Sequence, residues 1–269
     1  MSAEPGAGGP LATGPAPTRD WDACTYDRIS GVQEAWALEQ LERLELRGDE
    51  VLLDAGCGSG RVTARLVGLV PRGRVYAVDA SPAMVKHTRA RLGERVTALC
   101  QDLTELSLPE PVDVVFSNAT FHWIADHAKL FRALAGALVP GGQLVAQCGG
   151  YGNIDSFRLT ADEVARSGEF EPYFREWRGP WNYARAEITA ERLEVAGFAD
   201  VRTWLEPRPT LLEEPESFVS TVCLVRHLDL LPDDLHGSFI RAVLARTGVP
   251  LTLDYVRLNM VARRAVRRR

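Results

Sequence analysis

The sequence is poor in cysteine, and its cysteines show no pairing pattern. Five are scattered along 269 residues, and no two of them stand in a Cys-x-x-Cys spacing. An odd and scattered set argues against a disulfide framework and against a zinc site built from clustered thiols. Three lie in or beside apolar stretches, where a free thiol behaves as a small buried hydrophobe. We therefore expect a reducing compartment, with the cytoplasm as the default.

Long apolar runs and a strong excess of charge are also missing. No segment is apolar enough to span a bilayer, and residues 1–18 lack the basic and apolar regions of a secretion signal. The formal net charge of -5 argues against a chain that coats nucleic-acid phosphates. Arginines crowd together only at residues 263–269, where we expect a solvated tail rather than a tether. A small-molecule partner is therefore expected, with neither nucleic acid nor membrane.

What the sequence does contain is a regular alternation of strand-like and helix-like segments. Short apolar runs bounded by turns predict strands at 51–54, 74–79, 96–100, 112–117, 143–148, 201–205 and 252–263. Apolar spacing near the helical period predicts helices at 21–46, 61–70, 82–92, 127–138, 189–196, 216–228 and 235–245. This order predicts an α/β fold, with a doubly wound, mainly parallel, seven-stranded sheet and helices on both faces.

A glycine-rich turn follows the first predicted strand. In Asp54-Ala55-Gly56-Cys57-Gly58-Ser59-Gly60 the glycines allow the backbone to approach a ligand closely, with amides free to bind its polar groups. Asp79 ends the next strand roughly 20 residues on, where a ribose would need an acceptor. A dinucleotide site needs a further glycine at the position of Arg61, so the motif argues against NAD.

The pattern Asp-x-Gly-x-Gly-x-Gly resembles motif I of the class I S-adenosylmethionine-dependent methyltransferases. Residues 79–84 are similar to the family's next segment, in which the acid holds the ribose hydroxyls and the methionine packs on adenine. Residues 100–103 are similar to the stretch whose aspartate accepts from the adenine amino group, and residues 115–119 to motif IV. The resemblance implies a Rossmann-like fold, S-adenosylmethionine as cofactor and S-adenosylhomocysteine as product.

Within that family, residues 118–123 most resemble the trans-aconitate and malonyl-carrier carboxyl methyltransferases, whose pattern here ends in His-Trp. An N-terminal segment closes over the cofactor in that group, and three residues near the start of this chain match it. The cofactor-binding residues that the resemblance implies are Tyr26, Ser30, Gln33, Asp54, Gly56, Gly58, Gly60, Asp79, Ala80, Met84, Asp102, Leu103, Asn118 and Ala119.

Each of these residues also has a structural explanation that needs no ligand. The glycines can form a tight turn, Asp79 and Asp102 can cap helices, and Met84 can belong to the core. Asp54 is expected to orient the turn through backbone amides. His122 is a candidate catalytic base because imidazole titrates near neutral pH, although a histidine beside a tryptophan can equally be a packed wall.

The substrate region is expected beyond residue 148. Residues 171–183 are unusually aromatic, which favours either a lid over the substrate or ordinary packing at the sheet edge. Arginines can grip a carboxylate bidentately. The candidate substrate residues are Trp123, Tyr151, Trp177, Arg178, Trp181 and Arg226.

We expect one cofactor-binding core that carries a helical cap. The chain is expected to comprise a flexible tail (1–20), a core with an N-terminal lid helix (21–148), a cap insertion (149–190), the rest of the core with a helical insertion (191–263) and a basic tail (264–269).

The expected function is S-adenosylmethionine-dependent methyl transfer to a small molecule, with a carboxylate favoured because it needs no base. The alternatives are methylation of an O, N or C atom of a natural product, and a non-catalytic S-adenosylmethionine-binding partner protein. Asn118 is followed by Ala119 and Thr120 rather than by prolines, which argues against methylation of a flipped nucleic-acid base. The sequence shows no metal-ligand cluster, so no metal is expected.

Overall fold

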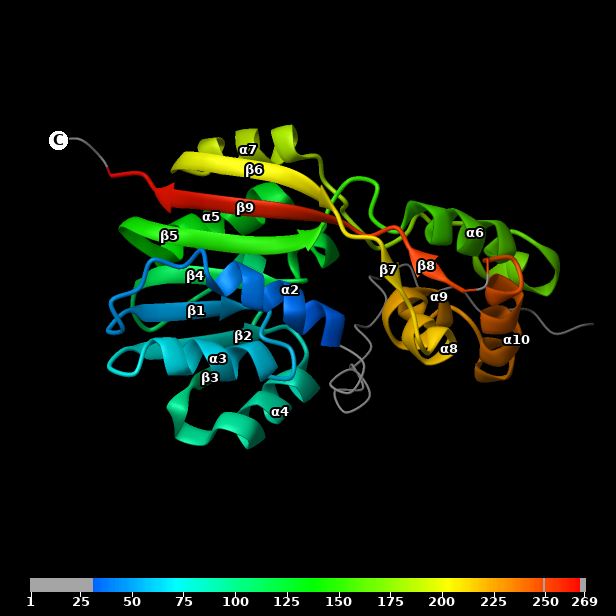
Figure 1. The fold of residues 1–269 in the computed structure, drawn as a ribbon, viewed down its shortest axis with the longest axis horizontal. Coiled ribbons are helices and arrows are strands. Elements are labelled where there is room, and N and C mark those ends of the chain that lie inside the picture. The colour runs from blue at the N-terminus through cyan, green and yellow to red at the C-terminus, as the bar shows by residue number, and fades with distance from the viewer. Residues whose placement is uncertain (1–30, 249, 267–269) are drawn as a thin grey trace, which may run out of the picture.

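The computed structural model describes residues 31–248 and 250–266. Strands and helices alternate through its first part, as predicted (Figure 1). Short 3-10 turns join several of them. In order, these elements are α2 (Gly31–Leu41), β1 (Val51–Ala55), α3 (Arg61–Leu69), β2 (Arg74–Asp79), α4 (Pro82–Leu92), η1 (Gly93–Arg95), β3 (Thr97–Cys100), η2 (Leu103–Glu105), β4 (Val112–Asn118), η3 (Phe121–Trp123), α5 (His127–Ala137) and β5 (Leu138–Gly149).

The predicted seven-stranded, mainly parallel sheet is confirmed. Its strand order is β3-β2-β1-β4-β5-β9-β6, with β6 (Phe198–Pro207) and β9 (Val256–Arg264) contributed by the second part of the chain. The first five strands in this order run parallel, and β9 runs antiparallel to both of its neighbours. The carboxyl ends of β1, β2 and β4 therefore meet at one edge, where ligands of open α/β sheets bind.

Helices cover both faces of this sheet. Leu130, Phe131 and Leu134 of α5 and Leu193 of α7 (Ala186–Val195) join the buried cluster on one face. Side chains of α2, α3 and α4 join the cluster on the other face. The predicted cap boundary at residue 190 falls inside α7, whose Ala186 and Leu193 belong to the apolar cluster of the sheet.

The remaining elements form a lobe beyond the carboxyl ends of the parallel strands (Figure 1). We call this lobe the cap. It has its own apolar cluster, in which Phe174, Leu224 and Phe239 are buried. Its elements are α6 (Asp155–Ala165), η4 (Gly168–Tyr173), β7 (Thr210–Leu211), α8 (Pro215–Phe218), the π-helical turn η5 (Val219–Cys223), α9 (Val225–Leu228), α10 (Asp233–Leu244) and β8 (Thr252–Leu253).

The N-terminal helix ends earlier than its apolar spacing predicts. The prediction reached residue 46, whereas α2 stops at Leu41. Leu44 and Leu46 still pack against the sheet cluster, but from an irregular segment. The amide of Glu45 in this segment donates to Gln143 Oε1 at 3.1 Å. Tertiary hydrogen bonds therefore replace helical ones while the apolar spacing continues.

Two cap elements are also divided differently from the prediction. The helix expected at 216–228 consists of α8, the π-helical turn and α9. The strand expected at 252–263 is split into β8 and β9 by Asp254 and Tyr255. The Asp254 carbonyl accepts from the Ile154 amide at 3.0 Å, and its carboxylate accepts from the Ser156 hydroxyl at 2.8 Å. These cap contacts take Asp254 out of the ladder.

Across the described residues, every helix falls short of the length and apolarity that crossing a membrane requires.

Candidate active site

The glycine turn after β1 is held against the end of β2. The amides of Gly56 and Cys57 both donate to the Val78 carbonyl, at 2.7 and 3.0 Å. Gly56, Gly58 and Gly60 have φ values of 88°, 52° and 79°, a backbone region that residues with a Cβ atom rarely adopt. The turn therefore needs glycine at each of these positions for conformational reasons alone.

The three glycines differ in the space that a Cβ atom would find at each position. A Cβ on Gly56 would lie 2.1 Å from Thr120 Oγ1, and one on Gly60 would lie 2.8 Å from Thr88 Oγ1. A Cβ on Gly58 would have no atom of the described structure within 4 Å, although Gly58 lines a cavity. Gly58 is thus the point at which a ligand can approach the backbone. Gly56 and Gly60 pack against neighbouring side chains.

Two aspartates flank the turn in different ways. Asp79 lines the cavity, and its carboxylate accepts from the Gly58 and Ser81 amides, each at 2.9 Å. Burial raises the pKa of Asp79, and these backbone hydrogen bonds oppose the increase. Asp54 lies behind the turn, where burial raises its pKa to about 7 while a 2.7 Å hydrogen bond from Thr63 Oγ1 opposes it. Asp54 therefore anchors α3 rather than lining the cavity, and its bond to the Thr63 side chain stands where contacts with backbone amides of the turn were expected.

The cavity between the sheet edge and the cap has a volume of about 580 Å³, within the usual range of small-molecule sites. It brings together many residues that the sequence singled out. The predicted residues in its wall are Gly56, Gly58, Asp79, Ala80, Met84, Asp102, Leu103, Asn118, Ala119, His122, Trp123, Trp181 and Arg226.

The other predicted site residues lie elsewhere. Tyr26 and Ser30 are outside the described residues, as is the side chain of Gln33. Asp54 and Gly60 lie behind the cavity wall, and Tyr151, Trp177 and Arg178 are not part of it.

The positions of Tyr151 and Trp177 have clear physical reasons. Tyr151 is half exposed, with the Arg185 guanidinium 3.5 Å from its ring centroid. Trp177 packs against the cap cluster and donates from Nε1 to Asp162 at 3.1 Å. The aromatic segment 171–183 thus divides, with one part in the core of the cap and Trp181 and Tyr183 in the cavity wall.

On the side of β1 and β2, the cavity offers both apolar walls and acceptors. Met84 and Leu103 are buried there. Asp102 begins η2 by accepting from the Thr104 amide at 2.7 Å. Ala119, which ends the β4 segment of the wall, has a φ of 57°, a strained value that proteins retain mostly at functional sites.

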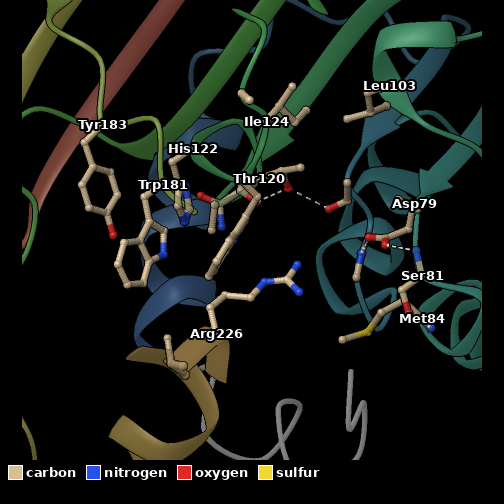
Figure 2. A pocket seen from close by; sticks show the side chains of 18 of the residues that line it. Asp79, Ser81, Met84, Leu103, Thr120, His122, Ile124, Trp181, Tyr183 and Arg226 are labelled. Carbon is tan, nitrogen blue, oxygen red and sulfur yellow. Dashed lines mark hydrogen bonds between the residues drawn. The ribbon is translucent and has the colours of Figure 1, made fainter. Parts of the chain in front are cut away.

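On the cap side, the wall is aromatic and carries a cation. His122 stacks on Tyr183 with centroids 5.8 Å apart, and Trp181 lies 6.0 Å from Tyr183 and 6.1 Å from Trp123. Arg226 of α9 extends into the space between Trp181 and Tyr183 on one side and Asp79 and Met84 on the other (Figure 2). Its Nη1 donates to Asp229 at 3.3 Å, which leaves the rest of the fork turned to the cavity.

The hydrogen bond that His122 accepts fixes which of its ring nitrogens carries the proton. Its Nδ1 accepts from the Gly149 amide at 3.3 Å, so the neutral ring carries its proton on Nε2. Burial, with the nearby charge of Arg257, holds the pKa of His122 well below its ordinary value. The nitrogen that could take a proton is thus occupied.

Sequence reasoning missed Arg257, a buried cation in the cavity wall. It lies on β9, where its Nε donates to Gln147 Oε1 at 3.2 Å and its guanidinium lies 4.6 Å from the Trp36 ring centroid. An arginine within the apolar run of the last strand was the available signal, because arginine is seldom fully buried without a specific role. Thr120 was also missed, and its hydroxyl donates toward the Asn118 carbonyl at 3.1 Å.

These features suit a cofactor that carries an adenosine. Asp79 can accept from ribose hydroxyls, Gly58 leaves the backbone open, and Met84 and Leu103 offer apolar surface. The sheet places antiparallel β9 between β5 and β6, and Arg61 stands where a dinucleotide site needs glycine. Fold and site together define a class I S-adenosylmethionine-dependent methyltransferase.

Comparison with known proteins identifies the family. Residues 53–146 match a family described as a methyltransferase domain. The chain is 32% identical over 190 residues to a malonyl-acyl-carrier-protein O-methyltransferase of Anoxybacillus flavithermus, covering 67% of this chain and 72% of that protein. It is 28% identical over 265 residues to a trans-aconitate 2-methyltransferase of Acidovorax sp. (strain JS42), covering 91% of this chain and 99% of the relative.

A solved structure, the YcgJ protein from Bacillus subtilis, shares the fold with a TM-score of 0.62 at 14% identity, covering 87% of this chain and 99% of that one. The chain belongs to the class I S-adenosylmethionine-dependent methyltransferases, in the group of the trans-aconitate and malonyl-carrier enzymes, as the sequence motifs predicted. S-adenosylmethionine is its cofactor and S-adenosylhomocysteine its product.

The glycine turn generates a matched pair of predictions. Gly58→Ala should fold, with a strain of about 1–2 kcal/mol from its positive φ, and should weaken S-adenosylhomocysteine binding at least about tenfold because the new methyl group enters the cavity. Gly60→Ala adds the contact with Thr88 to the same strain, so it should lower the unfolding free energy more and affinity less. Calorimetric titration and denaturant unfolding measure both effects. Equal affinity losses in the two variants would contradict this division of roles.

The buried carboxyl of Asp54 predicts a pH dependence of stability. Its folded pKa of about 7 lies above the ordinary value of 3.8, so its contribution is fully present below pH 4 and lost as the pH rises to 7. Asp54→Asn removes this titration. The unfolding free energy of the wild type should therefore fall relative to the variant by about 4 kcal/mol over that interval and then level off. Parallel curves for the two proteins would show that Asp54 is ionised throughout.

Proposed function

We propose that this methyltransferase esterifies a carboxylate of a small molecule, with the acceptor held on the cap side of the cavity. The observation that carries the proposal is Arg226, a cation placed between the cofactor side and an aromatic wall. A guanidinium fork matches a carboxylate bidentately. Trp123, Trp181 and Tyr183 offer apolar surface to the body of the acceptor.

The protonation states on the cap side support a carboxylate over an acceptor that must lose a proton. His122, Tyr183 and Cys223 are among the titratable groups that line this side. Burial raises the pKa of Cys223 to about 12 and also raises that of Tyr183, and the free nitrogen of His122 carries a proton. A hydroxyl, amine or carbon acceptor needs a base, whereas a carboxylate is already an anion.

S-adenosylmethionine, when bound, supplies a methyl group that its positively charged sulfur has already activated. The work of this chain is therefore positioning and exclusion of water. Gly58, Asp79, Met84, Asp102 and Leu103 would hold the cofactor. Arg226 would orient the carboxylate oxygen, and the aromatic wall would keep water from it. The Nε2 proton of His122 can donate to a second acceptor oxygen.

The same arrangement would favour release of the product. A methyl ester has lost the charge that pairs with a guanidinium, so its contact with Arg226 is weaker than that of the acid. The names of two relatives, which refer to trans-aconitate and to a malonyl carrier, fit a carboxylate acceptor. The free thiols Cys57, Cys100, Cys148 and Cys223 fit a reducing compartment such as the cytoplasm.

The proposal predicts selective methylation of acids. Carboxylic acids and their matched primary amides are incubated with methyl-labelled S-adenosylmethionine, and the products are tested for release of label by mild alkali. Label should enter acids only and be released, because esters are base-labile. Label in a stable ether, amine or carbon product would instead support methylation of another atom, and cofactor binding without turnover on any acceptor would support a non-catalytic binding protein.

Two variants of Arg226 sharpen this test. Arg226→Gln removes the charge and should raise the acceptor KM about 100-fold, as loss of a partly buried charge partner does. Arg226→Lys retains the charge but not the guanidinium fork, so its acceptor KM should lie between those of the wild type and Arg226→Gln. An unchanged acceptor KM in Arg226→Gln would place the carboxylate elsewhere.

The state of His122 predicts a flat pH profile. Because the imidazole is neutral and its free nitrogen bears a proton, kcat/KM should show no ionisation between about pH 6 and 8 that His122→Asn removes. His122→Asn retains an acceptor for the Gly149 amide and should lower kcat less than about tenfold, whereas loss of a general base lowers it about 100-fold to 10,000-fold. A loss in that range would restore His122 as the base.

A further inference from the structure

Helix α2 contacts both the sheet and the cap. Ala37 belongs to the apolar cluster on one face of the sheet, whereas its neighbour Trp36 belongs to the cluster of the cap. In Figure 1 the helix crosses between the sheet and the cap. Because the cavity lies between these same two bodies, the way α2 is attached influences the shape of the cavity.

Ion pairs fasten α2 on both sides. Toward the sheet, Glu34 pairs with Arg61 at 3.0 Å and with Arg65 at 3.7 Å, and Arg61 begins α3 directly after the glycine turn. Toward the cap, Glu39 accepts from both terminal nitrogens of Arg208, at 3.3 Å for Nη1. The helix therefore ties the cofactor turn to the segment that leaves β6 for the cap.

Between these pairs, Trp36 touches two residues of the cavity wall. Its ring meets that of Tyr255 edge-on at 5.0 Å, and the Arg257 guanidinium lies 4.6 Å from its centroid. Tyr255 and Arg257 both line the cavity. The backbone makes a further link, because the Arg208 amide donates to the Tyr255 carbonyl at 2.7 Å.

A chain of polar side chains joins Arg257 to the same ion pair. Arg257 donates to Gln147 at 3.2 Å, and Gln147 Nε2 donates to Asn259 Oδ1 at 2.8 Å. Asn259 Nδ2 donates to Glu206 at 3.3 Å, and Glu206 lies 2.8 Å from Arg208. Arg257 is thus oriented from two directions, by Trp36 above its guanidinium and by a chain that ends at Arg208 and Glu39.

We propose that α2 is a strap that positions Arg257 and Tyr255 against the methyl acceptor, and that Glu39 and Arg208 are positioning residues for this purpose. Neither Glu39 nor Arg208 lines the cavity, so both would act through Trp36 and the polar chain. The inference goes beyond the proposed function, on which only its enzymatic readout rests.

A charge swap tests the strap. Glu39→Arg and Arg208→Glu each place like charges together. The double variant restores an opposite pair across α2 but leaves a second carboxylate beside Glu206. Each single variant should raise the acceptor KM about threefold to tenfold, the range expected for one partly exposed pair turned repulsive, with kcat within twofold. The double variant should have a lower KM than either single variant, because the pair with α2 is restored. The matched control is the swap of Arg74 and Glu110, a 2.7 Å pair at the start of β2, away from the cavity, which should leave KM unchanged.

A second readout does not depend on any acceptor. Hydrogen exchange of the amide of residue 208, measured with S-adenosylhomocysteine bound, should be faster in both single variants than in the wild type and slower in the double variant than in either single variant. If no acid is methylated, the proposed function fails while this exchange pattern still supports the strap. Single variants that lower Tm but leave both exchange and acceptor KM unchanged would overturn it, as would a double variant that recovers Tm without recovering either.

Discussion

The carboxylate of Asp79 is the constraint on which the cofactor side of this molecule depends. By accepting from the Gly58 and Ser81 amides, it ties the turn after β1 to the turn after β2. A carboxylate has about four lone-pair directions, so the Gly58 and Ser81 amides leave capacity for a ribose hydroxyl. Burial disfavours the charge, and a cofactor that bears positive charge would offset this penalty. The same carboxylate thus holds the turn in place and offers an acceptor to a ribose.

The cavity depends equally on the separation of the sheet from the cap. Two apolar clusters cover the two faces of the sheet, and a third fills the cap. Residues from the sheet edge and from the cap reach the space between them, with the glycine turn on one side and Arg226 with Trp181 on the other. Because the cap has an apolar cluster of its own, the residues that line its side of the cavity are held separately from the cofactor turn.

The sheet and the cofactor turn could be predicted from the sequence because local patterns determine them. Apolar runs bounded by turns locate the strands, and the glycine motif with Asp79 lies within about 30 residues of chain. The end of α2 could not be predicted, since Leu44 and Leu46 continue the apolar spacing while a contact with Gln143 replaces the helix. Local pattern also could not separate Gly58 from Gly60, because the difference lies in Thr88 of another helix.

The cap side was harder to predict for the same physical reason. Trp177 and Trp181 look alike in sequence, yet Asp162 draws the first into the core of the cap and leaves the second in the cavity wall. Arg257 acquires its place from Gln147, 110 residues away. Such long-range partners leave no periodic signal in the chain.

Calorimetric titration of the purified protein with S-adenosylmethionine, S-adenosylhomocysteine and NAD tests the central claim most directly, with Asp79→Ala as the comparison. The account predicts micromolar binding of both sulfur nucleosides, much weaker binding by the variant, and no binding of NAD. Failure of the folded wild type to bind either sulfur nucleoside, or equal binding by the variant, would contradict the role assigned to this cavity and to Asp79.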